Sequence, residues 1–133
     1  ANQLKNLLVV DYQPIERLSE VLATADIHLV PLRAGLGDMS VPSKIYSVFA
    51  SGRPVIASVD PGTELDRIVT ESKGGISVPP DDFDSFIFAL ENLIKNSELR
   101  EEMGKKARVW LENCYSSKTI ADSYLDLIER LNR

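Results

Sequence analysis

The sequence is poor in the residues that build metal sites and disulfides, since its 133 residues include one cysteine and one histidine. Cys114 alone excludes an internal disulfide and leaves no cysteine pair for a zinc site, so we expect a reducing, cytoplasmic compartment. His28, inside the apolar stretch "DIHLVPL", has no second histidine beside it for a metal site or a catalytic triad. We interpret Cys114 as a small apolar helix-terminal residue and His28 as a strand residue, and we expect no metal.

Runs of one charge and long apolar runs are also missing. Acidic and basic residues are interleaved at a net charge of −5, so no basic stripe can follow the phosphates of a nucleic acid, and no nucleic acid partner is expected. No apolar run approaches the length that spans a bilayer, and the N-terminus has no signal-peptide pattern. The composition, 44% hydrophobic and 26% charged, is that of an ordinary soluble domain.

The order of the apolar patterns predicts an α/β fold. Consecutive apolar residues, which suit strands covered on both faces, occur at 7–10, 27–32, 54–59 and 75–79. Amphipathic helical patterns separate these runs, at 14–26, 43–52 and 63–75. Repeated strand-helix-strand units predict an open, Rossmann-like parallel sheet with flanking helices. We expect a single domain over 1–133, with β/α units over 1–80 and a C-terminal helical segment over 81–133.

Ligands of such sheets bind outside the carboxyl ends of the strands, which directs attention to the loops at 11–13, 33–41 and 60–63. The chain contains no phosphate-loop motif, no nucleophile elbow and no dinucleotide fingerprint. Its abrupt apolar beginning, and a length that is short for an enzyme with two substrates, lead us to expect a cut through a larger protein.

The strongest local signal is the stretch "SVPSKIYSVFASGRPVIASVD" at 40–60, where Ser43 and Lys44 open a predicted helix at the carboxyl edge of the sheet. Free backbone N–H groups and the positive end of a helix can bind phosphate, and Ser43 and Lys44 add a hydroxyl donor and a cation. A diphosphate fits this chemistry. From residue types alone, the alternative stays open that Ser43 only caps the helix and that Lys44 is solvated.

Four stretches together resemble a known family and cover nearly all of the chain: "YQPIERLSEVLATADIHLVPL", "VPSKIYSVFASGRPVIASVD", "GGISVPPDD" and "REEMGKKARVWLE". In order and spacing they are similar to the C-terminal, donor-binding part of a retaining GT-B glycosyltransferase of family 4 (group 1). The "VPSKIYS" form resembles the branch for surface-polysaccharide or lipid-linked sugar assembly. The resemblance implies a hexosyltransferase that moves a sugar from a nucleoside diphosphate sugar to a glycan or lipid-linked acceptor at the membrane surface. It also implies retention at the anomeric carbon, no cofactor and no essential metal.

The resemblance implies a place for each part of the donor. The diphosphate lies at the N-terminus of the helix that corresponds to 43–51, and the nucleoside reaches the loops after the strands. The candidate substrate-binding residues are then Tyr12, Gln13, Asp38, Met39, Ser40, Ser43, Lys44, Ser47, Thr63 and Glu64. Among them, Ser43 and Lys44 are the phosphate candidates, and Tyr12 and Gln13 lie where the base would be held. No catalytic residue is assigned.

One departure from the family pattern concerns carboxylates. Many relatives have two glutamates eight residues apart, and an ungapped alignment places Met39 and Ser47 at these positions, where neither can act as a carboxylate. Thr63 and Glu64, in the loop "DPGTE", would approach the sugar or ribose, so Glu64 or Asp38 is the candidate to compensate. Loss of activity is the other outcome that the departure leaves open.

The family's donor domain has two further strand-helix units before the strand at 7–10, and an acceptor domain before those. Since neither is in this chain, we expect it to be inactive alone, and either to pair its strands differently or to complete its sheet with another copy. Two alternatives to a glycosyltransferase stay open. A sugar-nucleotide epimerase of the same architecture needs an acid pair for proton abstraction. A non-enzymatic flavodoxin-like binding module needs clustered acids after the first strand, where Asp11 stands alone.

Overall fold

The computed structural model describes residues 4–37 and 43–132 of the chain. The elements are, in chain order, η1 (Ile15–Arg17), α1 (Leu18–Thr24), β1 (His28–Pro31), α2 (Lys44–Ala50), β2 (Val55–Ser58), α3 (Glu64–Ser72), β3 (Gly75–Val78), α4 (Phe83–Lys95), α5 (Ser97–Tyr115) and α6 (Ser117–Leu131). All three strands fall inside runs predicted from the sequence, and the α/β fold with its C-terminal helices is confirmed. None of the helices in these two ranges is both long and apolar enough to cross a membrane.

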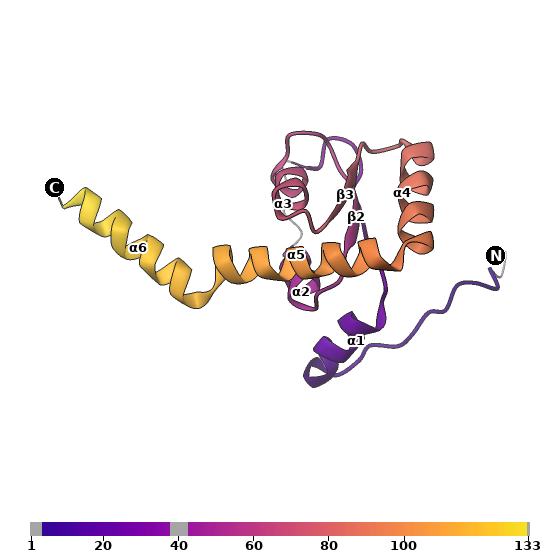
Figure 1. The fold of residues 1–133 in the computed structure, drawn as a ribbon, viewed down its shortest axis with the longest axis horizontal. Helices are drawn as coiled ribbons and strands as arrows, with labels where there is room; N and C mark the ends of the chain where they lie inside the picture. Colours follow the sequence, from indigo (N-terminus) through magenta and orange to yellow (C-terminus); the bar gives the residue numbers. More distant parts are fainter. Residues whose placement is uncertain (1–3, 38–42, 133) are drawn as a thin grey trace.

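Within the described ranges, the three strands form a parallel sheet in the order β1-β2-β3. In this register, Ile56 of β2 lies between Leu29 of β1 and Ile76 of β3. Helices α2, α3 and α5 pack on one face of the sheet, and α4 packs on the other (Figure 1). The central strand has Val55, Ile56 and Ala57 at 0% exposure. Cover on both faces explains why its sequence is a continuous apolar run.

Helix α2, which precedes this central strand, is anchored by buried side chains. Ile45 and Phe49 are fully buried and Val48 nearly so, which puts the expected apolar stripe on the face toward the sheet. Gly52 follows at φ 69°, and its N–H donates to the carbonyl oxygen of Phe49 over 3.0 Å. The helix therefore ends at a left-handed glycine, the residue that adopts this conformation most readily.

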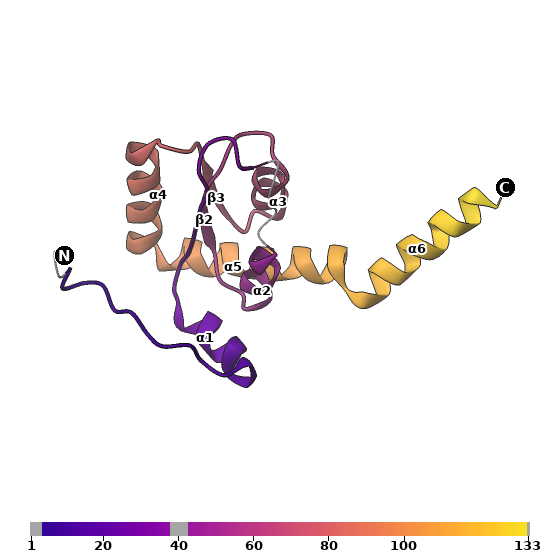
Figure 2. The ribbon, with the colours of Figure 1, turned by 180° about the vertical axis from the view of Figure 1, so that it is seen from behind.

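The prediction of a strand at 7–10 is wrong. In the structure this segment is extended but has no strand partner among the described residues, and Leu8 and Val9 are each 84% exposed. A strand without neighbours is not stable in water, because its backbone groups exchange no ladder hydrogen bonds and its side chains bury little surface. Figure 2 shows the N-terminal segment running outside the sheet toward α1. Among the described residues, β1 likewise has a strand neighbour on one side only.

Helix α5 crosses below the sheet in Figure 1, and α6 continues outward from it. No residue of α6 is buried, whereas α5 packs closely on the core. Gly104 of α5 faces Gly52, and a Cβ built at Gly104 would lie 2.7 Å from the carbonyl carbon of Gly52. Further along α5, Trp110 meets Phe49 edge to face at a centroid distance of 6.1 Å. Trp110 therefore packs on the core and is partly buried there.

An aromatic contact between α2 and the end of α5 makes stability depend on pH. The rings of Tyr46 and Tyr115 have centroids 4.9 Å apart. Burial, together with the hydrogen bond to Tyr115, raises the pKa of Tyr46 from 10.0 to about 12. Because the folded pKa lies above the unfolded one, this contribution is complete below pH 10 and is lost as the pH rises toward 12.

Tyr46→Phe keeps the ring and removes the ionising hydroxyl. As the pH rises from 10 toward 12, the free energy of unfolding of this variant should therefore fall less than that of the wild type. We expect the two curves to diverge by about 1 kcal/mol, a value reduced for the partial exposure of the ring. Denaturant unfolding of both proteins at several alkaline pH values measures the difference. Parallel curves would show that Tyr46 does not carry the pH dependence.

Candidate functional site

Two loops meet at the carboxyl end of the sheet, where the sequence predicts a ligand site. The loop 32–37 follows β1 and the loop 59–63 follows β2. The carboxylate oxygen Oδ2 of Asp60 accepts a hydrogen bond from the N–H of Gly35 at 2.8 Å. The two loops are therefore bonded to each other across 25 positions of sequence.

Thr63, a predicted substrate-binding residue, lies where these loops touch and is 6% exposed. Its Oγ1 donates to the carbonyl oxygen of Asp60 over 2.7 Å. Its methyl carbon Cγ2 would lie 2.5 Å from a Cβ built on Gly37, so the backbone of the first loop rests directly on this side chain. Thr63 thus uses its hydroxyl proton inside its own loop, and only its oxygen lone pairs remain for a ligand.

Glu64, the next predicted residue, begins α3 and is half-buried. Arg67 donates to it over 2.6 Å, and Arg67 also reaches Glu71 over 3.1 Å. The hydrogen bond from Arg67 lowers the pKa of Glu64. Glu64 is therefore a carboxylate at neutral pH, which suits it to accept hydrogen bonds from sugar or ribose hydroxyls and not to donate a proton.

Ser43 and Lys44 lie at the front of α2, and both are exposed. Ser43 makes no side-chain capping hydrogen bond, so the alternative that it caps the helix is not what the structure has. Lys44 forms no ion pair with any residue in the described ranges. The chain leaves β1 at the carboxyl edge and returns through α2 to the start of β2, which directs the front of α2 toward the ligand-binding edge.

Ser47 is half-buried on α2 and faces α1 rather than the two loops. It lies in a small groove of about 240 Å³ between these helices, lined by Leu18, Ser19, Leu22, Ser47, Ala50 and Ser51. Nothing acidic lines this groove. In the structure, as in the sequence, Ser47 brings no carboxylate to the site.

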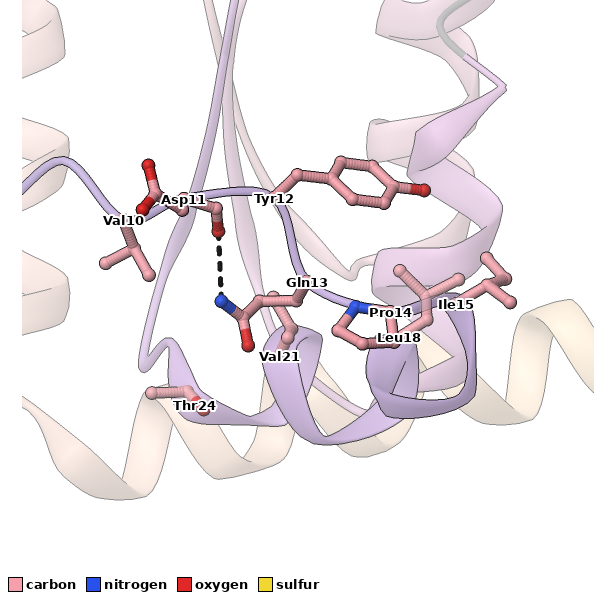
Figure 3. A pocket seen from close by; sticks show the side chains of 9 residues that line it. All are labelled: Val10, Asp11, Tyr12, Gln13, Pro14, Ile15, Leu18, Val21 and Thr24. Atoms are coloured by element: carbon pink, nitrogen blue, oxygen red, sulfur yellow. Dashed lines mark hydrogen bonds between the residues drawn. The ribbon is translucent and has the colours of Figure 1, made fainter.

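Tyr12 and Gln13 lie in a larger groove of about 480 Å³ beside α1 (Figure 3). Gln13 donates through Nε2 to the carbonyl oxygen of Asp11 over 3.0 Å and accepts from Arg17 over 3.1 Å. Tyr12 is 89% exposed, and its ring extends away from Gln13 (Figure 3). Because the segment before them forms no strand, these residues do not mark a strand end. Their groove lies beside α1, and Figures 1 and 2 show α1 at the opposite end of the sheet from α3, which follows the loop 59–63.

The predicted site residues Asp38, Met39 and Ser40 lie outside the described residues. Two residues at the carboxyl edge were not singled out from the sequence. Arg33 is exposed two residues after β1 and adds a cation there, and Asp60 joins the two loops. Within 4–37 and 43–132, no three histidine, cysteine, aspartate or glutamate side chains gather closely enough to hold a metal ion.

Comparison with known proteins gives two matches. The family model described as "Glycosyl transferases group 1" matches residues 1–96, which include the whole sheet, α2 and α3. A Pseudomonas aeruginosa protein with the name "Probable glycosyltransferase WbjE" is 36% identical over 69 residues, which cover 52% of this chain. The same alignment spans 17% of that relative's length. No solved structure matches the chain.

Proposed function

Because the chain belongs to the group 1 glycosyltransferase family, we propose that it forms the donor-binding part of a retaining GT-B hexosyltransferase. The observation that carries the proposal is the family match over 1–96, which spans the sheet and the loops at its carboxyl end. The donor is a nucleoside diphosphate sugar. The acceptor is a glycan or a lipid-linked intermediate presented at the cytoplasmic surface of a membrane.

The front of α2 binds the donor's diphosphate in this proposal. Ser43 offers a hydroxyl with no capping role, and Lys44 offers an ammonium group that is unpaired within the described part of the chain. The first backbone N–H groups of α2 have no acceptor inside the helix and lie at this same end. As the bond between the anomeric carbon and the phosphate oxygen breaks, negative charge builds on the leaving diphosphate. Hydrogen-bond donors that are already in place stabilise this charge without rearrangement. This stabilisation is the largest contribution that a binding domain makes to the rate.

Glu64 supplies the carboxylate for the sugar or ribose in this proposal, with Thr63 as an acceptor beside it. Glu64 is ionised and stands at the start of α3, directly after the loop that bonds to Gly35. Asp38, Met39 and Ser40 complete this part of the proposal on sequence grounds, as does Ser47. Tyr12 and Gln13 stay in the proposal as contacts to the base on the family resemblance alone, because in the structure their groove beside α1 lies away from Glu64.

The unpaired edge of β1 is covered in the assembled enzyme in this proposal, either by an additional part of the enzyme on the acceptor side or by a second copy. Leu29 on this strand is 49% exposed, although it lies in register with the fully buried Ile56. An exposed strand edge with apolar side chains pairs readily with another strand. No observation favours the epimerase or the flavodoxin-like module over the transferase.

The proposal is tested by titrating the intact protein with UDP, GDP and ADP while following its thermal unfolding. A ligand that binds the folded state at a hundredfold excess over its Kd adds about 2.7 kcal/mol, which raises Tm by several degrees. We expect at least one nucleoside diphosphate to do so and the matching monophosphate to do so less. A Tm that none of the three changes would contradict the proposal.

A further inference from the structure

We propose that the free edge of β3 binds the extended segment 7–10 of a second copy of this chain as an antiparallel strand. Among the described residues, two features lack a partner and match each other. One is a strand edge with an apolar hollow on each face of the sheet, and the other is an exposed, extended apolar segment. Reciprocal exchange between two copies closes a dimer and covers both edges and both segments. The inference concerns assembly and does not depend on donor binding.

The first part of the argument is the backbone of β3, which pairs with β2 on one side only within the described ranges. The carbonyl oxygens of Gly74 and Val78 accept hydrogen bonds from the β2 side, at 3.1 and 2.9 Å. In a parallel ladder, successive residues direct their backbone groups alternately to the two sides of the strand. Gly75 and Ser77 therefore direct their N–H and C=O groups away from β2, where an added strand can bind them.

The second part is that hollows lie beside this edge on both faces of the sheet. One hollow, of about 520 Å³, lies between β3 and α4, and its apolar lining includes Val78 and the exposed ring of Phe88. The other, of about 390 Å³, lies between β3, α3 and α5 and is lined in part by Leu99 and Met103. Figure 1 shows α3 and α4 on opposite sides of β3. A strand added to an edge places alternate side chains on opposite faces, so each hollow can hold every second one.

The third part is the segment 7–10 itself, which is extended and has four exposed leucine and valine side chains. Consecutive apolar residues suit a strand that is covered on both faces. In an antiparallel pairing of 7–10 with 75–78, Leu7 and Val9 lie on the face of Val78, toward the hollow beside α4. The other two side chains lie toward the hollow beside α3. The β3 edge thus provides the cover that the pattern of the segment requires.

The charges at the two ends of each partner set the direction of the pairing. In the segment, Lys5 precedes the apolar run and Asp11 follows it. At β3, Lys73 precedes the strand, is exposed and forms no ion pair with a residue in the described ranges. Beyond the other end of β3 stand the exposed carboxylates of Asp81 and Asp84. An antiparallel pairing brings Asp11 to Lys73 and Lys5 to the two aspartates, whereas a parallel pairing brings like charges together.

The edge of β1 suits an added strand less well. The N–H groups of His28 and Leu32 donate to the β2 side, so by the same alternation Leu29 and Pro31 face the unpaired side. Pro31 has no N–H and cannot donate to an added strand. Since both outward residues of β3 carry an N–H, we assign the segment to the edge of β3.

Sedimentation equilibrium of the full chain, from about 1 to about 100 μM, tests the inference. We expect the mass to rise from that of one chain to that of two. Leu8→Pro removes an N–H from the added strand, and Val9→Asp puts a carboxylate into an apolar hollow, so each should raise the dissociation constant of the dimer at least about tenfold. Leu8 and Val9 are exposed and lie in no helix or strand, so neither change should alter the fold of one chain. A one-chain mass for the wild type at every concentration, or variants that dimerise like the wild type, would overturn the inference.

Charge reversal tests the direction of the pairing. Asp11→Lys and Lys73→Asp should each raise the dissociation constant about threefold to fivefold, and the double variant should return to within about twofold of the wild type. Lys118→Asp is the matched control, because Lys118 is an exposed lysine on α6, and this change should have little effect. A double variant that is weaker than both single variants would contradict an antiparallel pairing at this edge.

Hydrogen exchange at low and high protein concentration identifies the edge that is used. The amide of Ser77 should exchange about tenfold more slowly in the dimer, because it donates to the added strand there. The amide of Leu29 should exchange at the same rate at both concentrations. Protection of Leu29 in place of Ser77 would put the added strand on β1 and overturn the inference.

Discussion

Gly104→Ala should lower the free energy of unfolding by about 2–3 kcal/mol, which is the opposite of the usual effect of this substitution in a helix. In an open helix, alanine is favoured over glycine by roughly 1 kcal/mol because glycine loses more backbone entropy on folding. At Gly104 the new Cβ would fall well inside van der Waals contact with the carbonyl oxygen of Gly52. The opposing atoms belong to the backbone, so relief requires α5 to move away from the turn that leads into β2.

A matched pair on the same helix isolates this effect. Glu101 is exposed, and its pairing with Lys105 at 3.7 Å is a weak surface contact. There, Glu101→Ala should be more stable than Glu101→Gly by about 1 kcal/mol. Urea unfolding of these variants and of Gly104→Ala measures both differences. A Gly104→Ala protein as stable as the wild type would mean that α5 does not pack on Gly52 as closely as the structure has it.

Lys44→Ala should weaken nucleoside diphosphate binding by roughly 10- to 100-fold, the range expected for the loss of one charge-assisted hydrogen bond to a phosphate. Lys44 is exposed and forms no ion pair among the described residues, so the fold gains little from it. The ligand-free protein should therefore unfold at the wild-type Tm. Isothermal titration with UDP, GDP and ADP gives the affinities, and thermal unfolding without ligand gives the control for folding.

Lys118→Ala provides the control for a general loss of positive charge. Lys118 is also an exposed lysine near the front of a helix, but it lies on α6, which extends away from the sheet (Figure 1). Its removal should leave diphosphate affinity within about twofold of the wild type. If Lys44→Ala and Lys118→Ala bind like the wild type, Lys44 has no role in the site.

The central strand and its helices could be predicted because their signals are local. The run at 54–59 is apolar on consecutive positions, and the structure buries it on both faces. The stripe of α2 and the glycine that ends it are likewise readable within ten residues. The run at 7–10 looks the same, yet it is exposed, because an apolar pattern does not say whether a neighbouring strand is present. Strand pairing is a property of distant parts of the chain.

The candidate site was less predictable than the sheet, because its contacts also join distant parts of the chain. Ser43 and Lys44 were predicted because they open a predicted helix, whereas Thr63 and Glu64 were implied by the family resemblance. The sequence "DPGTE" marks a turn whose aspartate is typical of binding its own loop. Its bond to a loop 25 positions earlier could not be read from that pattern. Tyr12 and Gln13 were placed near the base because they follow the predicted strand at 7–10. Since that strand does not form, their role in base binding remains a proposal that the structure does not test.

The most direct test of the account is hydrogen exchange of the intact protein with and without the nucleoside diphosphate that binds it best. We expect slower exchange over 43–47 and 60–64 in the presence of ligand, because the front of α2 and the start of α3 form the proposed binding site. Exchange in α6 should stay the same. Protection confined to α5 and α6, or no protection with UDP, GDP or ADP, would contradict a diphosphate site at the front of α2.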